Sequence, residues 1–143
     1  MIKNILVPVD GSAGSDRAVA QAVAIAASCG AKIFFLYVAN INQLAINAYL
    51  SDAIMSAVQK AGQVILDRAE NMVPSDIDYE THSETGSPAV TILEFVKRLE
   101  IDLIVMGSRG LGLIKGVLLG SVSQYVVEQA QCPVLVVKAG NDD

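Results

Sequence analysis

The chain has 143 residues and a mass of 15.0 kDa, which suits a single domain over residues 1–143 with room for a buried core. Hydrophobic residues make up 52% and charged residues 17%, a composition that excludes a disordered chain. The formal net charge of −5 has the wrong sign for a protein that binds nucleic acid by releasing counterions. No apolar run approaches the ~20 residues of a membrane span and no signal peptide opens the chain, so we expect a cytoplasmic protein.

Cysteine and histidine usage restricts the chemistry available to the chain. Cys29 and Cys132 show neither a C-x-x-C spacing nor a metal-ligand spacing, and we expect both thiols to be reduced and unbridged. The single histidine, His82, cannot supply a His-rich metal site. We expect it to be a surface residue of an edge strand, and no pair of carboxylates is placed for general acid and base catalysis.

Strands and helices alternate along the first half of the chain. Residues 2–9 are apolar at both parities and end in Asp10 and Gly11, which is typical of a strand buried on both faces. Alanines at helical spacing predict a helix over 16–29, closed by Gly30. A second apolar strand covers 32–38, and an apolar repeat of three to four residues predicts a long helix from about residue 45 to residue 72.

The second half continues the alternation. Residues 77–82 alternate in polarity, as an exposed edge strand would, and Ser87 and Pro88 mark the start of a helix that ends near Leu99. A doubly buried strand over 102–107 leads into a glycine-rich loop over 108–119. Ser121 and Gln124 have the spacing of a capping box and predict a helix over 121–130, followed by a last strand over 133–138.

This alternation predicts an α/β fold, with one parallel five-stranded sheet and helices on both faces, of the Rossmann-like type. Because the third strand is polar and the first and fourth are the most apolar, we expect the strand order 3-2-1-4-5. Ligands of such sheets bind beyond the carboxyl ends of the strands where the order reverses, here between the first and fourth strands. Asp10 and the loop that follows Gly107 both open into that crevice.

The last strand, 133–138, forms the second edge of the expected sheet although it is apolar on both faces. An uncovered apolar edge favours pairing with another chain. The sequence therefore predicts a homodimer joined through this strand, and cover by a neighbouring helix is the alternative.

The glycine-rich segment after the fourth strand carries the clearest chemical signal. Gly107 and Gly110 allow backbone amides to approach a ligand closely, and the helix that begins after Gly120 offers unpaired N–H groups with a partial positive charge. This arrangement suits a phosphate group, with Arg109 or Lys115 as a supporting cation. A flexible surface loop accounts for the same glycines, and Asp10 can equally be a turn residue at the start of a helix.

From Gly107 to Ser121 the segment also fits Gly-x2-Gly-x9-Gly-Ser, and it resembles the glycine pattern of the ATP-binding subgroup of the universal stress protein family. The resemblance extends over nearly the whole chain, through residues 5–12, 86–88, 106–110, 120–123 and 132–137. It implies a nucleotide-binding domain with the adenine nucleotide alpha-hydrolase-like fold that dimerises through its last strand.

Position by position, the resemblance implies that four parts of the chain bind ATP or AMP. Pro8, Val9 and Asp10 would lie against the nucleoside, with Asp10 near the ribose or near the Mg²⁺ that accompanies a triphosphate. Val38 would receive the adenine through its main chain. The remaining contacts to the ribose and phosphates would come from Met106, Gly107, Ser108, Arg109, Gly110, Gly120, Ser121, Val122 and Ser123.

The residues and the resemblance together predict an adenine-nucleotide-binding stress-response or regulatory protein whose nucleotide state alters its shape or its binding to a protein target. A slow ATPase and a nucleotide-free dimerisation module are the alternatives. The P-loop pattern is absent, and so is G-x-G-x-x-G after the first strand. Weak ATP hydrolysis is therefore the most catalysis that we expect.

Overall fold

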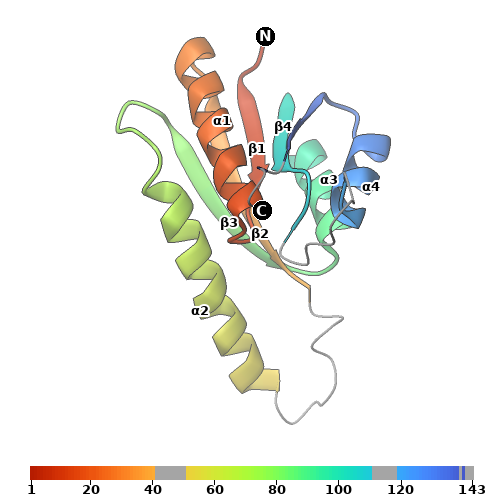
Figure 1. Ribbon diagram of the computed structural model, residues 1–143. Helices are drawn as coiled ribbons and strands as arrows, with labels where there is room; N and C mark the ends of the chain where they lie inside the picture. The colour runs from red at the N-terminus through yellow and green to blue at the C-terminus, as the bar shows by residue number, and fades with distance from the viewer. Residues whose placement is uncertain (41–50, 111–118, 139, 141–143) are drawn as a thin grey trace.

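The computed structural model describes residues 1–40, 51–110, 119–138 and 140, and Figure 1 shows one sheet with helices on both faces. All strand pairs are parallel, and the strand order is β3-β2-β1-β4-β5, as predicted. In chain order the elements are β1 (Asn4–Pro8), α1 (Ala13–Cys29), β2 (Lys32–Ala39), α2 (Ser51–Glu70), β3 (Tyr79–Thr85), α3 (Pro88–Arg98), β4 (Leu103–Gly107), α4 (Ser121–Gln129) and β5 (Val134–Val137).

Alternate residues of the central strands supply two separate hydrophobic cores. Ile5 and Val7 of β1 face the core formed with α1 and α2, whereas Leu6 faces the core formed with α3 and α4. In β4, Val105 and Ile104 divide in the same way. All five side chains are fully buried, which explains why these strands are apolar at both parities.

Helix α1 carries specific signals at both ends. Ser12 Oγ accepts a hydrogen bond from the Ser15 amide at 3.1 Å and caps the N-terminus. Gly30 adopts the left-handed conformation with φ +73°, and its amide donates to the Ala26 carbonyl, as expected for a C-terminal cap. Because Ser12 is the N-cap, the helix begins at Ala13, earlier than the predicted residue 16.

The start of α4 differs from the prediction, because the N-cap is Gly120 and not Ser121. Gly120 is extended, with φ −69° and ψ 166°, and its carbonyl accepts a hydrogen bond from the Gln124 amide at 2.9 Å. Ser121 is therefore already inside the first turn, and no side-chain capping bond forms. The predicted capping box is wrong, since its spacing does not decide which carbonyl begins the helix.

Helix α2 ends at Glu70, before the predicted Met72. The amides of Met72 and Val73 bond to carbonyls three residues earlier, those of Ala69 and Glu70, and this tighter pattern ends the α-helix. The predicted start near residue 45 lies outside the described residues.

Within the described ranges, no helix combines the length and the apolar character that crossing a bilayer requires.

The polar strand β3 forms one edge of the sheet, as predicted. It begins at Tyr79 and not at residue 77, because the Ile77 amide closes a turn onto the Pro74 carbonyl. Glu80 is exposed and pairs with Lys32 Nζ of the neighbouring strand at 2.7 Å. The apolar strand β5 forms the opposite edge.

A hydrogen-bonded cluster joins the start of β1 to the start of β4. Asp102 Oδ2 accepts hydrogen bonds from the amides of Lys3 and Asn4 at 2.8 and 2.9 Å. The Asn4 side chain donates to the carbonyls of Leu99 and Glu100, and Glu100 has a φ of +53°. The two backbone amides hold the pKa of Asp102 below its ordinary value.

The substitution Asp102→Asn removes the charge that these amides stabilise. A carboxylate with a lowered folded-state pKa contributes stability above its unfolded-state pKa, and this contribution is lost as the pH falls through the folded-state pKa. We expect Asp102→Asn to lower the free energy of unfolding by about 1 kcal/mol at pH 7, and the difference from wild type to shrink at an acid pH below the ordinary pKa of aspartate. Urea unfolding at both pH values measures the effect.

The exposed Asp76 provides the control, because Asp76→Asn makes the same charge change at a position outside this cluster. We expect it to leave the unfolding free energy unchanged at both pH values. A deficit for Asp102→Asn that persists undiminished at low pH would contradict a charge-based contribution.

Candidate functional site

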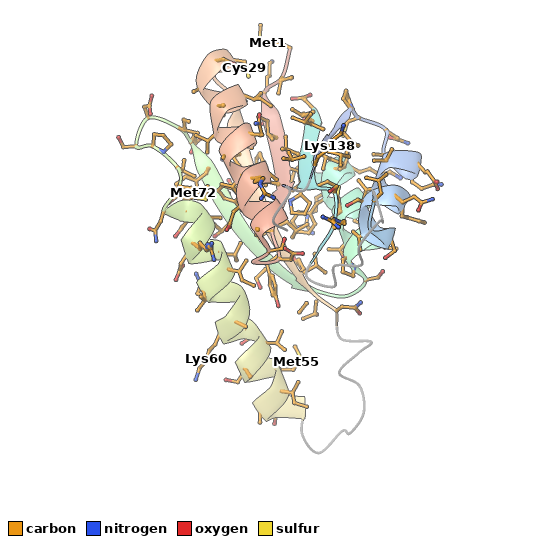
Figure 2. The ribbon with its side chains drawn as sticks, in the orientation of Figure 1. Met1, Cys29, Met55, Lys60, Met72 and Lys138 are labelled. Atoms are coloured by element: carbon orange, nitrogen blue, oxygen red, sulfur yellow. The ribbon has the colours of Figure 1, made fainter. Side chains whose placement is uncertain are left out.

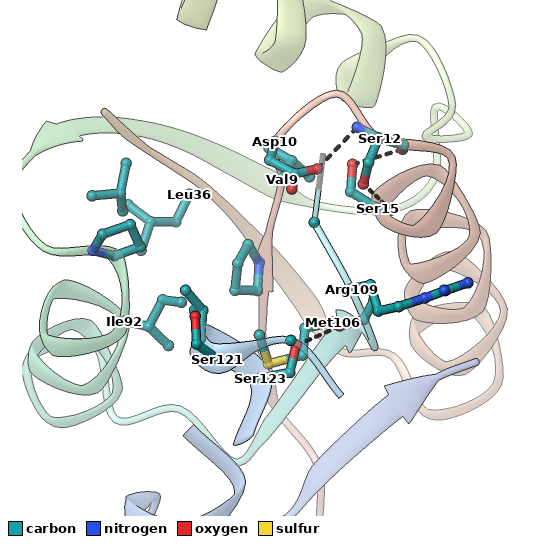
Figure 3. Close-up of a pocket in the computed structure, with 17 residues that line it drawn as sticks. Val9, Asp10, Ser12, Ser15, Leu36, Ile92, Met106, Arg109, Ser121 and Ser123 are labelled. Atoms are coloured by element: carbon teal, nitrogen blue, oxygen red, sulfur yellow. Dashed lines mark hydrogen bonds between the residues drawn. The ribbon is translucent and has the colours of Figure 1, made fainter. Parts of the chain in front are cut away.

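A cavity of about 340 Å³ lies beyond the carboxyl ends of β1 and β4, where the strand order reverses. This is the position at which open α/β sheets bind ligands. Figure 3 shows the side chains that surround it. The lining residues are Pro8, Val9, Asp10, Ser12, Ser15, Leu36, Val38, Pro88, Ile92, Met106, Gly107, Arg109, Gly110, Gly120, Ser121, Val122 and Ser123.

Two glycines bring two walls of the cavity into direct backbone contact. A methyl group on Gly107, at the end of β4, would lie 2.9 Å from the carbonyl carbon of Gly14 in the first turn of α1. A methyl group on Gly14 would lie 3.2 Å from the carbonyl oxygen of Arg109. The absence of a Cβ at both positions permits this approach, which holds the start of α1 against the loop after β4.

The Asp10 carboxylate connects the first turn of the chain with the glycine-rich loop. Its Oδ1 accepts a hydrogen bond from the Ser12 amide at 2.9 Å, which stabilises the turn between β1 and α1. Its Oδ2 lies 2.8 Å from the position that a methyl group on Gly110 would take. Asp10 is therefore both a turn residue and a residue of the cavity wall.

The first turn of α4 forms a polar wall of the cavity. Ser121, Val122 and Ser123 line it, and the first amides of a helix have no intrahelical acceptor. Their partial positive charge suits an anion. The buried Ser123 Oγ donates to the Gly107 carbonyl at 2.8 Å, so this hydroxyl proton joins α4 to β4 and is not available to a ligand.

The opposite wall is apolar and comes from β2 and α3. Leu36 and Ile92 are each 1% exposed, and Figure 3 shows both on the side of the cavity away from Ser12 and Ser15. Val38 lines this wall, as expected from the sequence.

Leu36, Pro88 and Ile92 are lining residues that sequence reasoning missed. The period of a strand could have indicated Leu36, because it lies two residues before Val38 and shares its face of β2. The sequence offers a weaker signal for Pro88 and Ile92. Ser87 and Pro88 predict a helix that begins just after the end of a strand, which places its first turn at the edge of the sheet where ligands bind.

Apart from Ser108, the structure brings the site residues expected from the sequence together around this one cavity. Ser108 is buried; its amide donates to the Val137 carbonyl at 3.0 Å and its carbonyl accepts from the Gly120 amide at 2.7 Å. It joins the loop to β5 and α4 and does not line the cavity. Arg109 is a lining residue, and in Figure 3 its guanidinium extends away from the apolar wall. Lys115 lies outside the described residues.

The remaining candidate residues lie outside the cavity. His82 Nε2 is 3.1 Å from a Glu80 carboxylate oxygen, and its ring meets Phe95 edge-on, so the side chain is half-buried and not simply a surface group. Cys29 and Cys132 are both free, as predicted. In the part of the chain that the structure describes, no three His, Cys, Asp or Glu side chains gather as metal ligands.

Comparison with known proteins gives consistent matches over the whole chain. The sequence profile of the universal stress protein family matches residues 1–138. Universal stress protein MJ0531 of Methanocaldococcus jannaschii is 35% identical over 141 residues, which cover 96% of this chain and 83% of that protein. The structure of universal stress protein UspA from Lactobacillus plantarum superposes with a TM-score of 0.79 at 32% identity, covering 95% of this chain and 97% of that one. A universal stress protein in complex with cAMP superposes with a TM-score of 0.68 at 29% identity, covering 95% and 96%.

The sheet order and the cavity at the reversal point define a Rossmann-like α/β domain. The chain belongs to the universal stress protein family. The resemblance inferred from the glycine pattern is therefore confirmed at the level of the family.

The contact between α1 and β4 predicts unequal effects of two alanine substitutions. Gly107→Ala places a methyl group 2.9 Å from backbone, whereas at Gly120 the nearest atom to such a methyl lies at an ordinary 3.5 Å. We expect Gly107→Ala to lower the free energy of unfolding by about 1–3 kcal/mol, and Gly120→Ala to lower it by about 0.5–1 kcal/mol, because alanine is a poorer N-cap than glycine. Urea midpoints for both variants measure this, and equal midpoints would argue against a tight contact at Gly107.

Proposed function

We propose that this protein binds an adenine nucleotide, ATP or AMP, in the cavity between the β1–α1 turn and the start of α4. The observation that carries the proposal is the division of the cavity into an apolar wall and a wall of helix amides with a carboxylate. A purine base needs the first kind of surface, and a phosphate group needs the second. We further propose that the bound nucleotide alters the binding of a protein target.

In this arrangement the base lies against Leu36, Val38 and Ile92. Asp10 reaches the ribose or the Mg²⁺ that accompanies a triphosphate, and the phosphates lie at Gly110 and the first turn of α4. The universal stress protein solved in complex with cAMP supports an adenine nucleotide as the ligand class.

A divalent cation fits the polar side of this arrangement. One oxygen of Asp10 is already bonded to the Ser12 amide, and the other faces Gly110. One carboxylate oxygen is sufficient for a Mg²⁺ ion that arrives with a triphosphate, because Mg²⁺ takes most of its ligands from phosphates and water. Asp10 is the residue that would hold it, and the ion would neutralise phosphate charge there.

The substitution Gly110→Val tests nucleotide binding. The Cβ of the valine would lie 2.8 Å from Asp10 Oδ2, so the added side chain would crowd the carboxylate that lines the cavity. We expect a loss of ATP and AMP affinity of more than about 100-fold, or about 2.7 kcal/mol, measured by calorimetric titration with and without Mg²⁺.

A second glycine supplies the control. Gly30 is the C-terminal cap of α1 and has a left-handed backbone conformation, which asparagine tolerates. The substitution Gly30→Asn adds a Cβ with no atom within 4 Å. Its nucleotide affinity is expected to equal that of wild type. Circular dichroism checks that Gly110→Val keeps its fold, and undiminished binding by the folded variant would refute the site.

We also propose that two chains pair through the edge strand β5, within residues 133–138. The carbonyls of Pro133 and Val137 accept bonds from Ile104 of β4 and from Ser108, the residue after β4, so the main-chain groups of Val134 and Val136 point away from the sheet. Leu135 is 38% exposed, and Tyr125 and Val127 of α4 are 44% and 42% exposed. An apolar edge with outward amide and carbonyl groups favours pairing with a second copy.

Proline substitutions at the two sheet edges test this pairing. Val136→Pro removes an outward amide of β5 and leaves its bonds to β4 in place. We expect this variant to sediment as a monomer at concentrations where wild type is a dimer. Ser83→Pro makes the matched change at an outward, exposed position of β3 and is expected to leave the assembly unchanged. A wild-type monomer, or a Val136→Pro dimer, would contradict pairing through β5.

A further inference from the structure

Helix α2 packs on the backbone of the turn that carries Asp10. Gly11, the next residue, has a φ of +83°, and a methyl group on it would lie 3.2 Å from Cγ1 and 3.4 Å from Cδ1 of Ile65. Ile65 is not a lining residue of the cavity. It therefore contacts the turn from outside, while the Asp10 carboxylate faces Gly110 on the inside.

Two further contacts determine where α2 lies along the molecule. Arg68 forms an ion pair with Asp16 in the first turn of α1. Gly62 lies against the ring of Tyr37, since a methyl group there would be 2.5 Å from a ring carbon. These contacts are all in the C-terminal half of α2, and in Figure 1 the N-terminal half extends past the sheet. Figure 2 shows Met55 and Lys60 on that projecting part.

We propose that Ile65 is a positioning residue for Asp10 and thereby contributes to the nucleotide affinity of the cavity, an inference that rests on the proposed function. A glycine in the turn gives its backbone more freedom than any other residue would. A rigid helix packed on Gly11 restricts that freedom before the ligand arrives, which lowers the entropy that binding must overcome. Affinity then depends on a side chain that never touches the ligand.

The first test uses the ligand-free protein. Ile65→Ala removes both carbon atoms that contact the turn, Ile65→Val keeps a γ-carbon at the contact, and Val64→Ala shortens the neighbouring side chain, which is 67% exposed. The readout is hydrogen exchange of the Ser12 amide, which bonds to Asp10 Oδ1. We expect exchange about tenfold faster in Ile65→Ala and near wild type in the other two variants. Unchanged exchange in Ile65→Ala would overturn the proposal.

The second test asks whether Ile65 acts through Asp10. We expect Ile65→Ala to weaken AMP binding by about threefold to tenfold, and to have no further effect when Asp10→Ala is already present. Equal losses in both backgrounds would show a general effect on the fold and would overturn the positioning role. Wild-type protein that binds neither AMP nor ATP would refute the proposed function alone, because the exchange measurement still decides whether Ile65 orders the turn.

Discussion

The backbone contact between Gly14 and Gly107 is the constraint on which the site depends. Strands β1 and β4 are neighbours, but α1 crosses one face of the sheet while α4 packs on the other. Contact between the first turn of α1 and the end of β4 closes the crevice on the α1 side. The remaining opening lies between Asp10, the start of α4 and the apolar wall. This boundary of the cavity is therefore a consequence of two positions that lack a side chain.

The order of the strands could be predicted because the composition of each strand indicates how many of its faces are buried. Val7 and Leu6 enter opposite cores, whereas no residue of β3 is fully buried and Glu80, Ser83 and Thr85 are exposed. Element ends were harder to predict because they depend on single hydrogen bonds. The Gln124 amide bonds to Gly120, and the Ile77 amide bonds to Pro74, and neither choice is visible in local residue preferences.

The candidate site shows the same difference. Its parts that depend on local sequence could be predicted, and those that depend on the packing of distant elements could not. The amide wall could be predicted, since glycines before a helix indicate exposed backbone whatever lies around them. The apolar wall could not be predicted completely, because Ile92 reaches the cavity only through the packing of α3 on the sheet. Ser108 illustrates the converse, since its place in a glycine-rich motif does not reveal that it is buried and bonded to Val137 and Gly120.

The contrast between the two sheet edges limits how far assembly through β5 could extend. Pairing of β5 with its own copy is isologous, so it consumes the apolar edge of both chains at once. The continuous sheet that results would end in β3 on either side, where Glu80 and its ion pair with Lys32 discourage addition of another strand. A pair joined through β5 would therefore be closed, and the charged β3 edges at its two ends would not support growth into a fibre by this route.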